Sequence, residues 1–271
     1  MATFYDSHAH LENPRFNDDL PQVLERAQAA GIARIVCVGI DRETSRQAIQ
    51  LSERFPNVFA TVGWHPSHAL EAPEDVRPVL RELASHPRVV AIGETGLDYF
   101  HPPESRAGGA AVSVEDYRRR QIRIFQQQLE LAAELGLNVV VHHRKSLDDC
   151  LAVMQPFAGR VRGQFHCFED SASAIQRVVA LGSLVSFTGL LTFKNRSDVR
   201  DALAAAPVGR FMLETDSPYL VPEPHRGKVK RCEPAFVKEI AAVAAQVKGC
   251  TLEELSAATC QTAQEFFPKM R

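Results

Sequence analysis

Eight short apolar runs alternate with longer amphipathic segments, and this alternation constrains the fold more than any other feature of the sequence. The runs are rich in β-branched or aromatic residues and end at glycine, histidine or an acidic residue, as short buried strands do. The expected strands cover residues 3–6, 34–39, 58–63, 89–94, 138–142, 162–166, 184–189 and 211–216. The expected helices cover residues 18–30, 43–54, 74–85, 115–135, 146–157, 171–181, 196–205 and 234–247, with a further helix over 252–266.

This alternation predicts an α/β fold with a parallel sheet closed into a single (β/α)8 TIM-type barrel, formed by residues 1–271 as one domain. An open doubly wound sheet is the alternative. No G-x-G-x-x-G motif or P-loop follows any expected strand, which favours the barrel. Residues 101–117 are rich in Pro, Gly, Ser and Ala and are expected to form a long loop after the fourth strand.

The composition is that of an ordinary globular protein, with 45% hydrophobic and 24% charged residues. Its apolar runs are too short to span a membrane, and no secretory signal is visible. Six scattered cysteines without a C-x-x-C pair favour a reducing cytoplasmic location over a disulfide framework. The net charge of −2 does not indicate a nucleic-acid binder, so any affinity for phosphate must come from local patches.

The stretch DSHAHL near the N-terminus holds two histidines, His8 and His10, one residue apart. Side chains at i and i+2 share one face of a strand, so both imidazoles are expected to point the same way if the first strand extends this far. Two imidazoles on one face can bind a divalent cation. A surface accident or a tag remnant is the alternative for this stretch taken alone.

Histidines and acidic residues also stand where other expected strands end, and barrel enzymes work at the carboxyl ends of their strands. The residues at these positions are His8, His10, His65, Glu94, His142, His166 and Asp216. Taken singly, each histidine could be a hydrogen-bonded loop residue, and each acidic residue a helix N-cap. Their joint placement at six strand ends predicts a metal centre, because such a site needs inward groups from several strands.

Six motifs in order resemble those of the TatD family of metal-dependent hydrolases. The motifs are DSHAHL, GWHP, GETGLDY, VVVHHR, FHCF and LETDSPYLVPEPHRGK, and they extend from residue 6 to about residue 234. This family belongs to the amidohydrolase superfamily and is usually described as TatD-type deoxyribonucleases. The resemblance implies the same barrel that the strand pattern predicts.

The resemblance also implies two divalent metal ions, for which Mg²⁺, Mn²⁺ and Zn²⁺ all suit a set of imidazoles and carboxylates. His8, His10 and Asp216 would bind one ion, His142 and His166 would bind the other, and Glu94 would bridge both. His65 would lie beside the ions and contact the scissile group.

The chain departs from the family in the longer 101–117 loop and at two residues. Asn138 replaces a frequent Pro, and Cys232 replaces a frequent Asn. None of these departures touches an expected ligand, so they concern the shape of the substrate rather than hydrolysis.

Hydrolysis at such a centre needs no serine nucleophile, and no G-x-S-x-G motif is present. Divalent cations acidify water and stabilise charge on a phosphoryl or acyl group. Asp216 is the expected general base, and Glu94 and His65 are the other expected catalytic residues.

Basic residues near the expected site favour a phosphate-containing substrate. Arg144 follows His142, and Arg226 and Lys228 follow Asp216, so all three are candidate phosphate contacts. Trp64, the only tryptophan, is a candidate platform for a base. A solvated basic surface and a tryptophan in the core are the alternatives.

These observations predict a metal-dependent 3′–5′ exonuclease acting on DNA or RNA ends, with nucleic acid as its partner. No membrane and no obligate protein partner is expected. One alternative is a hydrolase of another ester or amide, such as D-aminoacyl-tRNA. A metal-binding protein without catalysis is the other, and the intact set of candidate ligands argues against it.

Overall fold

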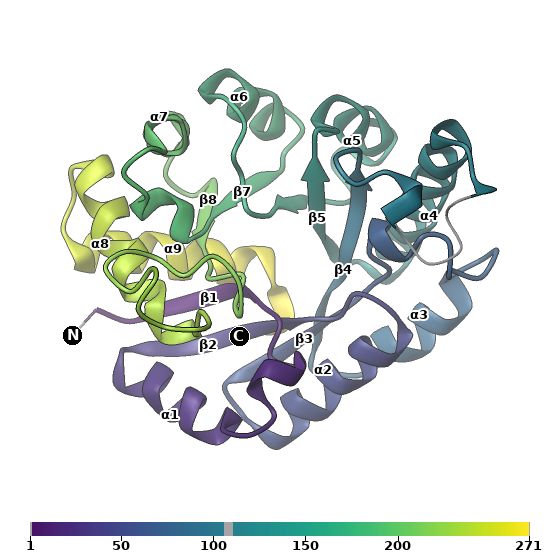
Figure 1. Ribbon diagram of the computed structural model, residues 1–271. Coiled ribbons are helices and arrows are strands. Elements are labelled where there is room, and N and C mark those ends of the chain that lie inside the picture. The colour runs from purple at the N-terminus through teal and green to yellow at the C-terminus, as the bar shows by residue number, and fades with distance from the viewer. Residues whose placement is uncertain (1, 106–110, 271) are drawn as a thin grey trace.

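In the part of the chain that the structure describes, eight parallel strands, one for each apolar run, form the centre of the protein (Figure 1). The computed structural model describes residues 2–105 and 111–270. The strands are β1 (Phe4–Ala9), β2 (Ile32–Val38), β3 (Val58–Val62), β4 (Val89–Asp98), β5 (Asn138–Arg144), β6 (Gly163–Phe165), β7 (Leu184–Phe187) and β8 (Phe211–Leu213). Each strand pairs with the next one along the chain, in the order β1 to β8.

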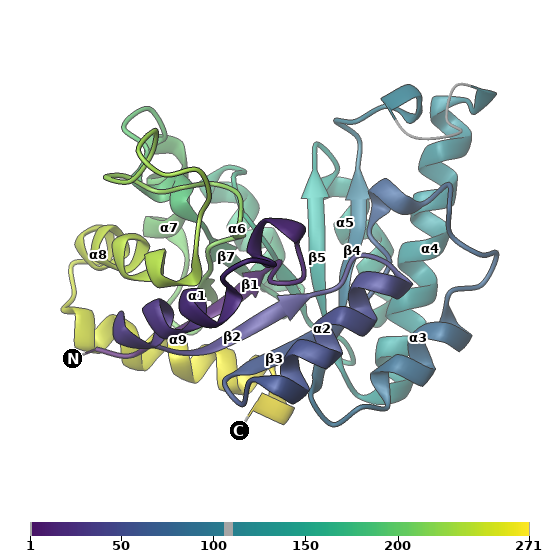
Figure 2. The same ribbon diagram turned by 60° about the horizontal axis from the view of Figure 1, so that its bottom comes forward.

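The helices lie outside the strands, as Figure 1 and Figure 2 show. They are α1 (Leu20–Ala29), α2 (Arg42–Arg54), α3 (Arg77–Ala84), α4 (Val114–Leu135), α5 (Leu147–Met154), α6 (Ala172–Ala180), α7 (Ser197–Ala205), α8 (Val237–Lys248) and α9 (Leu252–Phe266). Among the described residues, no helix is long and apolar enough to cross a membrane.

The sheet closes at the carboxyl ends of β1 and β8, where Ala9 forms an isolated parallel bridge with Ser217. The backbone N–H of His10 donates to the carbonyl of Ser217 at 2.8 Å, and that of Asp216 donates to the carbonyl of His8 at 2.9 Å. The predicted (β/α)8 barrel is therefore confirmed. Its closure also brings the first and last strand-end motifs into direct contact.

The apolar core has two layers because alternate residues of a strand face opposite sides. Val36 and Val38 of β2 belong to an inner cluster, whereas Ile35 and Cys37 pack in the layer between strands and helices. Phe266, at the end of α9, joins the inner cluster together with Phe267 and Met270. The C-terminal segment thus packs against inward-facing strand residues.

Three strands extend beyond their predicted ends. β5 continues past His142 to Arg144, and the extensions of β1 and β4 shape the site. β1 continues to Ala9 and therefore includes His8. β4 continues to Asp98 instead of ending at Glu94. Gly96, with a φ of 123°, makes this continuation possible, because a Cβ there would lie 2.0 Å from the carbonyl oxygen of His142 on β5. β8 ends earlier than predicted, at Leu213, and Asp216 follows in a left-handed conformation with a φ of 54°.

The predicted loop over residues 101–117 contains a short 3-10 helix, Pro103–Ser105, and ends where α4 begins at Val114. Ser113 starts that helix, because its Oγ accepts a hydrogen bond from the backbone N–H of Asp116 at 3.0 Å. Residues 106–110, also part of this prediction, lie outside the described residues.

Candidate active site

A pocket of about 740 Å³ opens at the carboxyl ends of the strands. Its wall includes His10, His65, Glu94, His142, His166 and Asp216, which come from the ends of six different strands or the loops that follow them. His8 lies beneath them, fully buried. The structure therefore brings together all seven strand-end residues that the sequence indicated.

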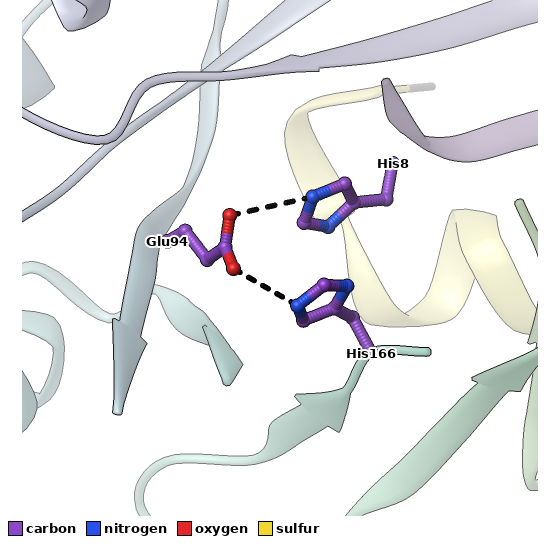
Figure 3. Close-up of side chains that lie close together, drawn as sticks. All are labelled: His8, Glu94 and His166. Atoms are coloured by element: carbon purple, nitrogen blue, oxygen red, sulfur yellow. Dashed lines mark ion pairs between the residues drawn. The ribbon is translucent and has the colours of Figure 1, made fainter. Parts of the chain in front are cut away.

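Glu94 lies at the centre of this cluster, and its two carboxylate oxygens face different sets of imidazoles. Oε2 lies 3.5 Å from His8 Nε2 and 3.6 Å from His10 Nε2. Oε1 lies 2.9 Å from His166 Nε2, 3.1 Å from His142 Nδ1 and 3.2 Å from His65 Nε2. Figure 3 shows His8 and His166 approaching the two oxygens from different positions. A carboxylate in this arrangement can contact two cations at once.

Asp216 completes the set around Oε2. Its Oδ1 lies 3.6 Å from His8 Nε2 and 3.4 Å from His10 Nε2. The left-handed backbone at Asp216 and the hydrogen bond from its N–H to His8 hold the carboxylate beside the two imidazoles. His8, His10 and Asp216 thus form one compact group of possible ligands.

The chemistry of these side chains fits divalent cations. His8 Nε2 lies 3.2 Å from His10 Nε2, and His142 Nδ1 lies 3.3 Å from His166 Nε2. Both pairs also face the oxygens of Glu94, which can only accept hydrogen bonds when ionised. Nitrogens and oxygens that converge in this way supply the lone pairs that a shared cation needs.

The ligand groups overlap more than the family resemblance implied. His166 groups with His8 and Glu94, and His142 groups with His65 and Glu94. The implied pair His142 and His166 still lies on one oxygen of Glu94, but His166 also stacks on His8 with ring centroids 4.1 Å apart. His8 and Glu94 each belong to two of these groups, so the groups of candidate ligands adjoin one another.

Burial and charge act in opposite directions on the groups of this cluster. Burial alone raises the pKa of Glu94, but the imidazoles of His166 and His65 outweigh it and hold that pKa well below its usual range. Burial alone lowers the pKa of His166, but the carboxylates of Glu94 and Glu214 outweigh it and raise that pKa to about 10. Only such close pairing makes buried ionised carboxylates tolerable.

His65 differs from the other imidazoles in its hydrogen bonds. Its Nδ1 accepts from the backbone N–H of Ser67 at 3.0 Å, so the neutral ring carries its proton on Nε2. Burial lowers the pKa of His65 to about 4, which keeps the ring neutral at neutral pH. His65 therefore presents an N–H donor toward Glu94 and the pocket.

Two carboxylates that the sequence reasoning missed support the imidazoles. Asp98 Oδ2 lies 3.3 Å from His142 Nε2, and Glu214 Oε1 lies 3.7 Å from His166 Nδ1. Glu214 also accepts hydrogen bonds from the backbone N–H of Cys167 at 2.6 Å and from Gln164 Nε2 at 3.0 Å. Asp98 lies in the motif GETGLDY and Glu214 in the motif LETDSP, so these motifs could have pointed to both residues.

The predicted substrate contacts are only partly at the pocket. Arg144 lines it, whereas Arg226 and Lys228 do not. The guanidinium of Arg226 lies instead 4.0 Å from the ring centroid of Phe193. The predicted phosphate contacts of Arg226 and Lys228 therefore stay predictions for the loop after β8. Arg196, which the sequence reasoning missed, lines the pocket and pairs with Glu169 at 2.9 Å.

The prediction that Trp64 stacks on a base is wrong. Trp64 is only 8% exposed, packs in the core and does not line the pocket. Its indole N–H donates to the carbonyl of His68 at 2.9 Å, which fixes the ring within the loop after β3.

Comparison with known proteins agrees with this geometry. The family model described as TatD related DNase matches residues 5–268. The chain belongs to the TatD family. The uncharacterized metal-dependent hydrolase YabD of Bacillus subtilis (strain 168) is 36% identical over 264 residues, covering 97% of this chain and 98% of that protein.

Two further TatD relatives cover almost the whole chain. The 3′-5′ ssDNA/RNA exonuclease TatD of Erwinia amylovora is 32% identical over 271 residues, covering 97% of this chain and 99% of its own. The solved structure of YJJV, a TatD homolog from Escherichia coli K12, superposes with a TM-score of 0.88 at 25% identity and covers 98% of both chains. The predicted resemblance is confirmed, and the protein is a metal-dependent hydrolase of the TatD family.

Proposed function

We propose that this hydrolase is a 3′–5′ exonuclease that shortens single-stranded DNA or RNA and uses two divalent metal ions. The observation that carries the proposal is the division of the imidazoles between the two oxygens of Glu94. Two-metal sites are frequent in nucleases, where they clamp the attacking and leaving oxygens of a phosphodiester. The name of the Erwinia amylovora relative supports the same substrate class.

The residues divide into two ligand sets that share Glu94. His8, His10 and Asp216 would hold one ion, and His142 and His166 would hold the other. A mixed set of imidazoles and carboxylates suits Mg²⁺, Mn²⁺ or Zn²⁺. When bound, such ions acidify water at neutral pH and withdraw charge from a phosphoryl group.

Three residues would act on the substrate. Asp216, half-buried at the pocket wall, would accept a proton from the attacking water. His65 would donate its Nε2 proton in a hydrogen bond to the scissile group, since Ser67 occupies Nδ1. Arg144, exposed at the pocket, would contact a phosphate oxygen.

We also propose that the protein acts in the cytoplasm. All six cysteines are free thiols in the structure, which suits a reducing compartment.

The test is degradation of single-stranded DNA and RNA oligonucleotides labelled at the 5′ end. We expect a ladder of products that shorten from the 3′ end, no reaction in EDTA, and recovery when Mg²⁺ or Mn²⁺ is restored. The Asp216→Asn variant, purified in parallel, controls for contaminating nucleases.

A parallel reaction with D-aminoacyl-tRNA tests the alternative substrate. If the protein cleaves this ester in a metal-dependent reaction and leaves both oligonucleotides intact, the exonuclease proposal is wrong.

A further inference from the structure

Tyr219 is the only large exposed apolar side chain, within residues 2–105 and 111–270, that lines the pocket. It is 45% exposed and follows Asp216 by three residues. Its backbone N–H donates to the carbonyl of Asp216 at 3.0 Å. Its ring centroid lies 6.1 Å from that of His10, with the two planes at 70°. An exposed aromatic ring therefore stands directly beside a candidate metal ligand.

Contacts with the loop after β1 hold this ring in position. Asn13 Nδ2 donates to the Tyr219 hydroxyl at 3.4 Å, and the guanidinium of Arg15 lies 5.7 Å from the ring centroid. Asn13 is itself fixed, because its Oδ1 accepts from the backbone N–H of Arg15 at 3.1 Å. The ring is thus positioned before a ligand arrives, so binding to it costs little conformational entropy.

We propose that Tyr219 stacks on the nucleobase that adjoins the scissile phosphodiester; this inference rests on the proposed exonuclease function. A phosphate at the metal ligands carries a planar base within one nucleotide, and Tyr219 offers an aromatic surface next to those ligands. Stacking on tyrosine tolerates every base, because each base has a π-face. The enzyme would therefore recognise the presence of a base rather than its identity.

Phe100 is the other exposed aromatic side chain near this end of the barrel, and it is less suited to the role. It does not line the pocket. Two cations already contact its ring: the guanidinium of Arg144 lies 4.7 Å from the ring centroid, and the ammonium of Lys145 lies 5.0 Å from it. Phe100 is 47% exposed, close to the 45% of Tyr219, which makes it a matched control.

The test compares a complete oligonucleotide with two that carry an abasic tetrahydrofuran residue, at the 3′-terminal or the penultimate position. For wild-type protein we expect kcat/KM to fall about 5- to 140-fold on whichever abasic substrate lacks the base that Tyr219 stacks on, the range for loss of one stacked base. Tyr219→Leu should lower kcat/KM on the complete oligonucleotide by a similar factor and have no further effect on that abasic substrate. Tyr219→Phe should retain the preference for the base, and Phe100→Leu should leave that preference unchanged.

The proposal fails if Tyr219→Leu lowers kcat/KM equally on all three substrates, because the ring would then act only through the structure of the pocket. It also fails if wild-type protein cleaves all three substrates equally, or if Phe100→Leu removes the preference as fully as Tyr219→Leu does. Metal content per chain, measured for each variant, should equal that of wild-type protein. If wild-type protein cleaves none of the oligonucleotides, the proposed exonuclease function fails instead.

Discussion

Glu94 shows at the scale of one residue how the site is built. Its side chain is 3% exposed, and an ionised carboxylate so deeply buried is costly unless charges or donors surround it. Five imidazoles do so, from β1, the loop after β1, the loop after β3, the end of β5 and the loop after β6. Because each oxygen faces a different set of imidazoles, Glu94 links all five of them.

We expect Glu94→Ala to reduce metal content more than His8→Ala does. Removal of Glu94 takes an oxygen from both ligand sets, whereas removal of His8 leaves His10 and Asp216 in place. The measurement is metal per chain by elemental analysis after dialysis against a fixed free-metal concentration. Retention of two ions by Glu94→Ala would show that the carboxylate does not bridge.

Glu239→Ala is the matched control for this experiment. Glu239 also pairs with a histidine, His225, at 3.2 Å, but neither residue lines the pocket. Its metal content should equal that of wild-type protein.

Asp216→Asn should lower kcat by about 10²- to 10⁴-fold, the usual contribution of a general base. The substitution keeps the size of the side chain but removes the basic oxygen that faces His8 and His10. Single-turnover rates at saturating metal separate this effect from weaker metal binding. A rate within a few-fold of wild type under those conditions would exclude Asp216 as the base.

At the scale of secondary-structure elements, the candidate metal ligands and the C-terminal part of the apolar core lie in different parts of the barrel. The carboxyl ends of its strands carry the imidazoles and carboxylates, whereas the C-terminal segment that starts at Phe266, the last residue of α9, packs in the inner apolar cluster. Phe266 and Phe267 in that segment are fully buried and lie edge to face, with ring centroids 4.8 Å apart. The segment should therefore contribute to stability without contacting the metal ligands.

Phe266→Ala should lower the free energy of unfolding by about 3–5 kcal/mol, because it removes a buried ring and leaves a cavity. Urea denaturation measures the change. Val208→Ala, at a 70% exposed position, should change the same quantity by less than about 0.5 kcal/mol. If the folded Phe266→Ala protein lost its metal ions, the two ends of the barrel would not be independent.

At the scale of the whole molecule, the net charge of −2 requires any attraction to nucleic acid to come from local cations. Arg144 lies at the pocket, whereas Arg226 and Lys228 lie on the loop after β8, away from its lining. A short substrate would reach only Arg144, and a longer strand could extend to the other two.

Salt dependence of binding distinguishes these contacts. Binding is measured on the Asp216→Asn protein. In this background, Arg144→Ala should reduce the slope of log K against log salt by about 0.7, the value for one lost phosphate contact. The reduction should be the same for short and long single strands. Arg226→Ala combined with Lys228→Ala should reduce the slope only for long strands. Fluorescence anisotropy at several salt concentrations measures both slopes. If the double variant leaves the slope for long strands unchanged, the loop after β8 does not contact the nucleic acid and is an ordinary solvated surface.

The sequence by itself was sufficient to predict the barrel and to indicate the candidate metal ligands that the fold brings together. Strand propensity and alternation are local properties, so eight apolar runs separated by amphipathic segments were enough to predict the sheet. His8, Glu94, His166 and Asp216 could be grouped because the carboxyl ends of parallel strands meet on one face of a barrel. Six ordered motifs then sufficed to predict the TatD family.

Only the tertiary structure decided how these residues divide and what surrounds them. The two oxygens of Glu94 face different imidazoles, and β4 continues past Glu94 to Asp98; the local pattern indicated neither. Contacts with distant segments also involve Trp64, whose backbone N–H donates to Gln128 on α4, and Tyr219, whose hydroxyl accepts from Asn13. Asn13 and Tyr219 are 206 positions apart, and contacts over such separations are set by closure of the barrel rather than by neighbouring residues.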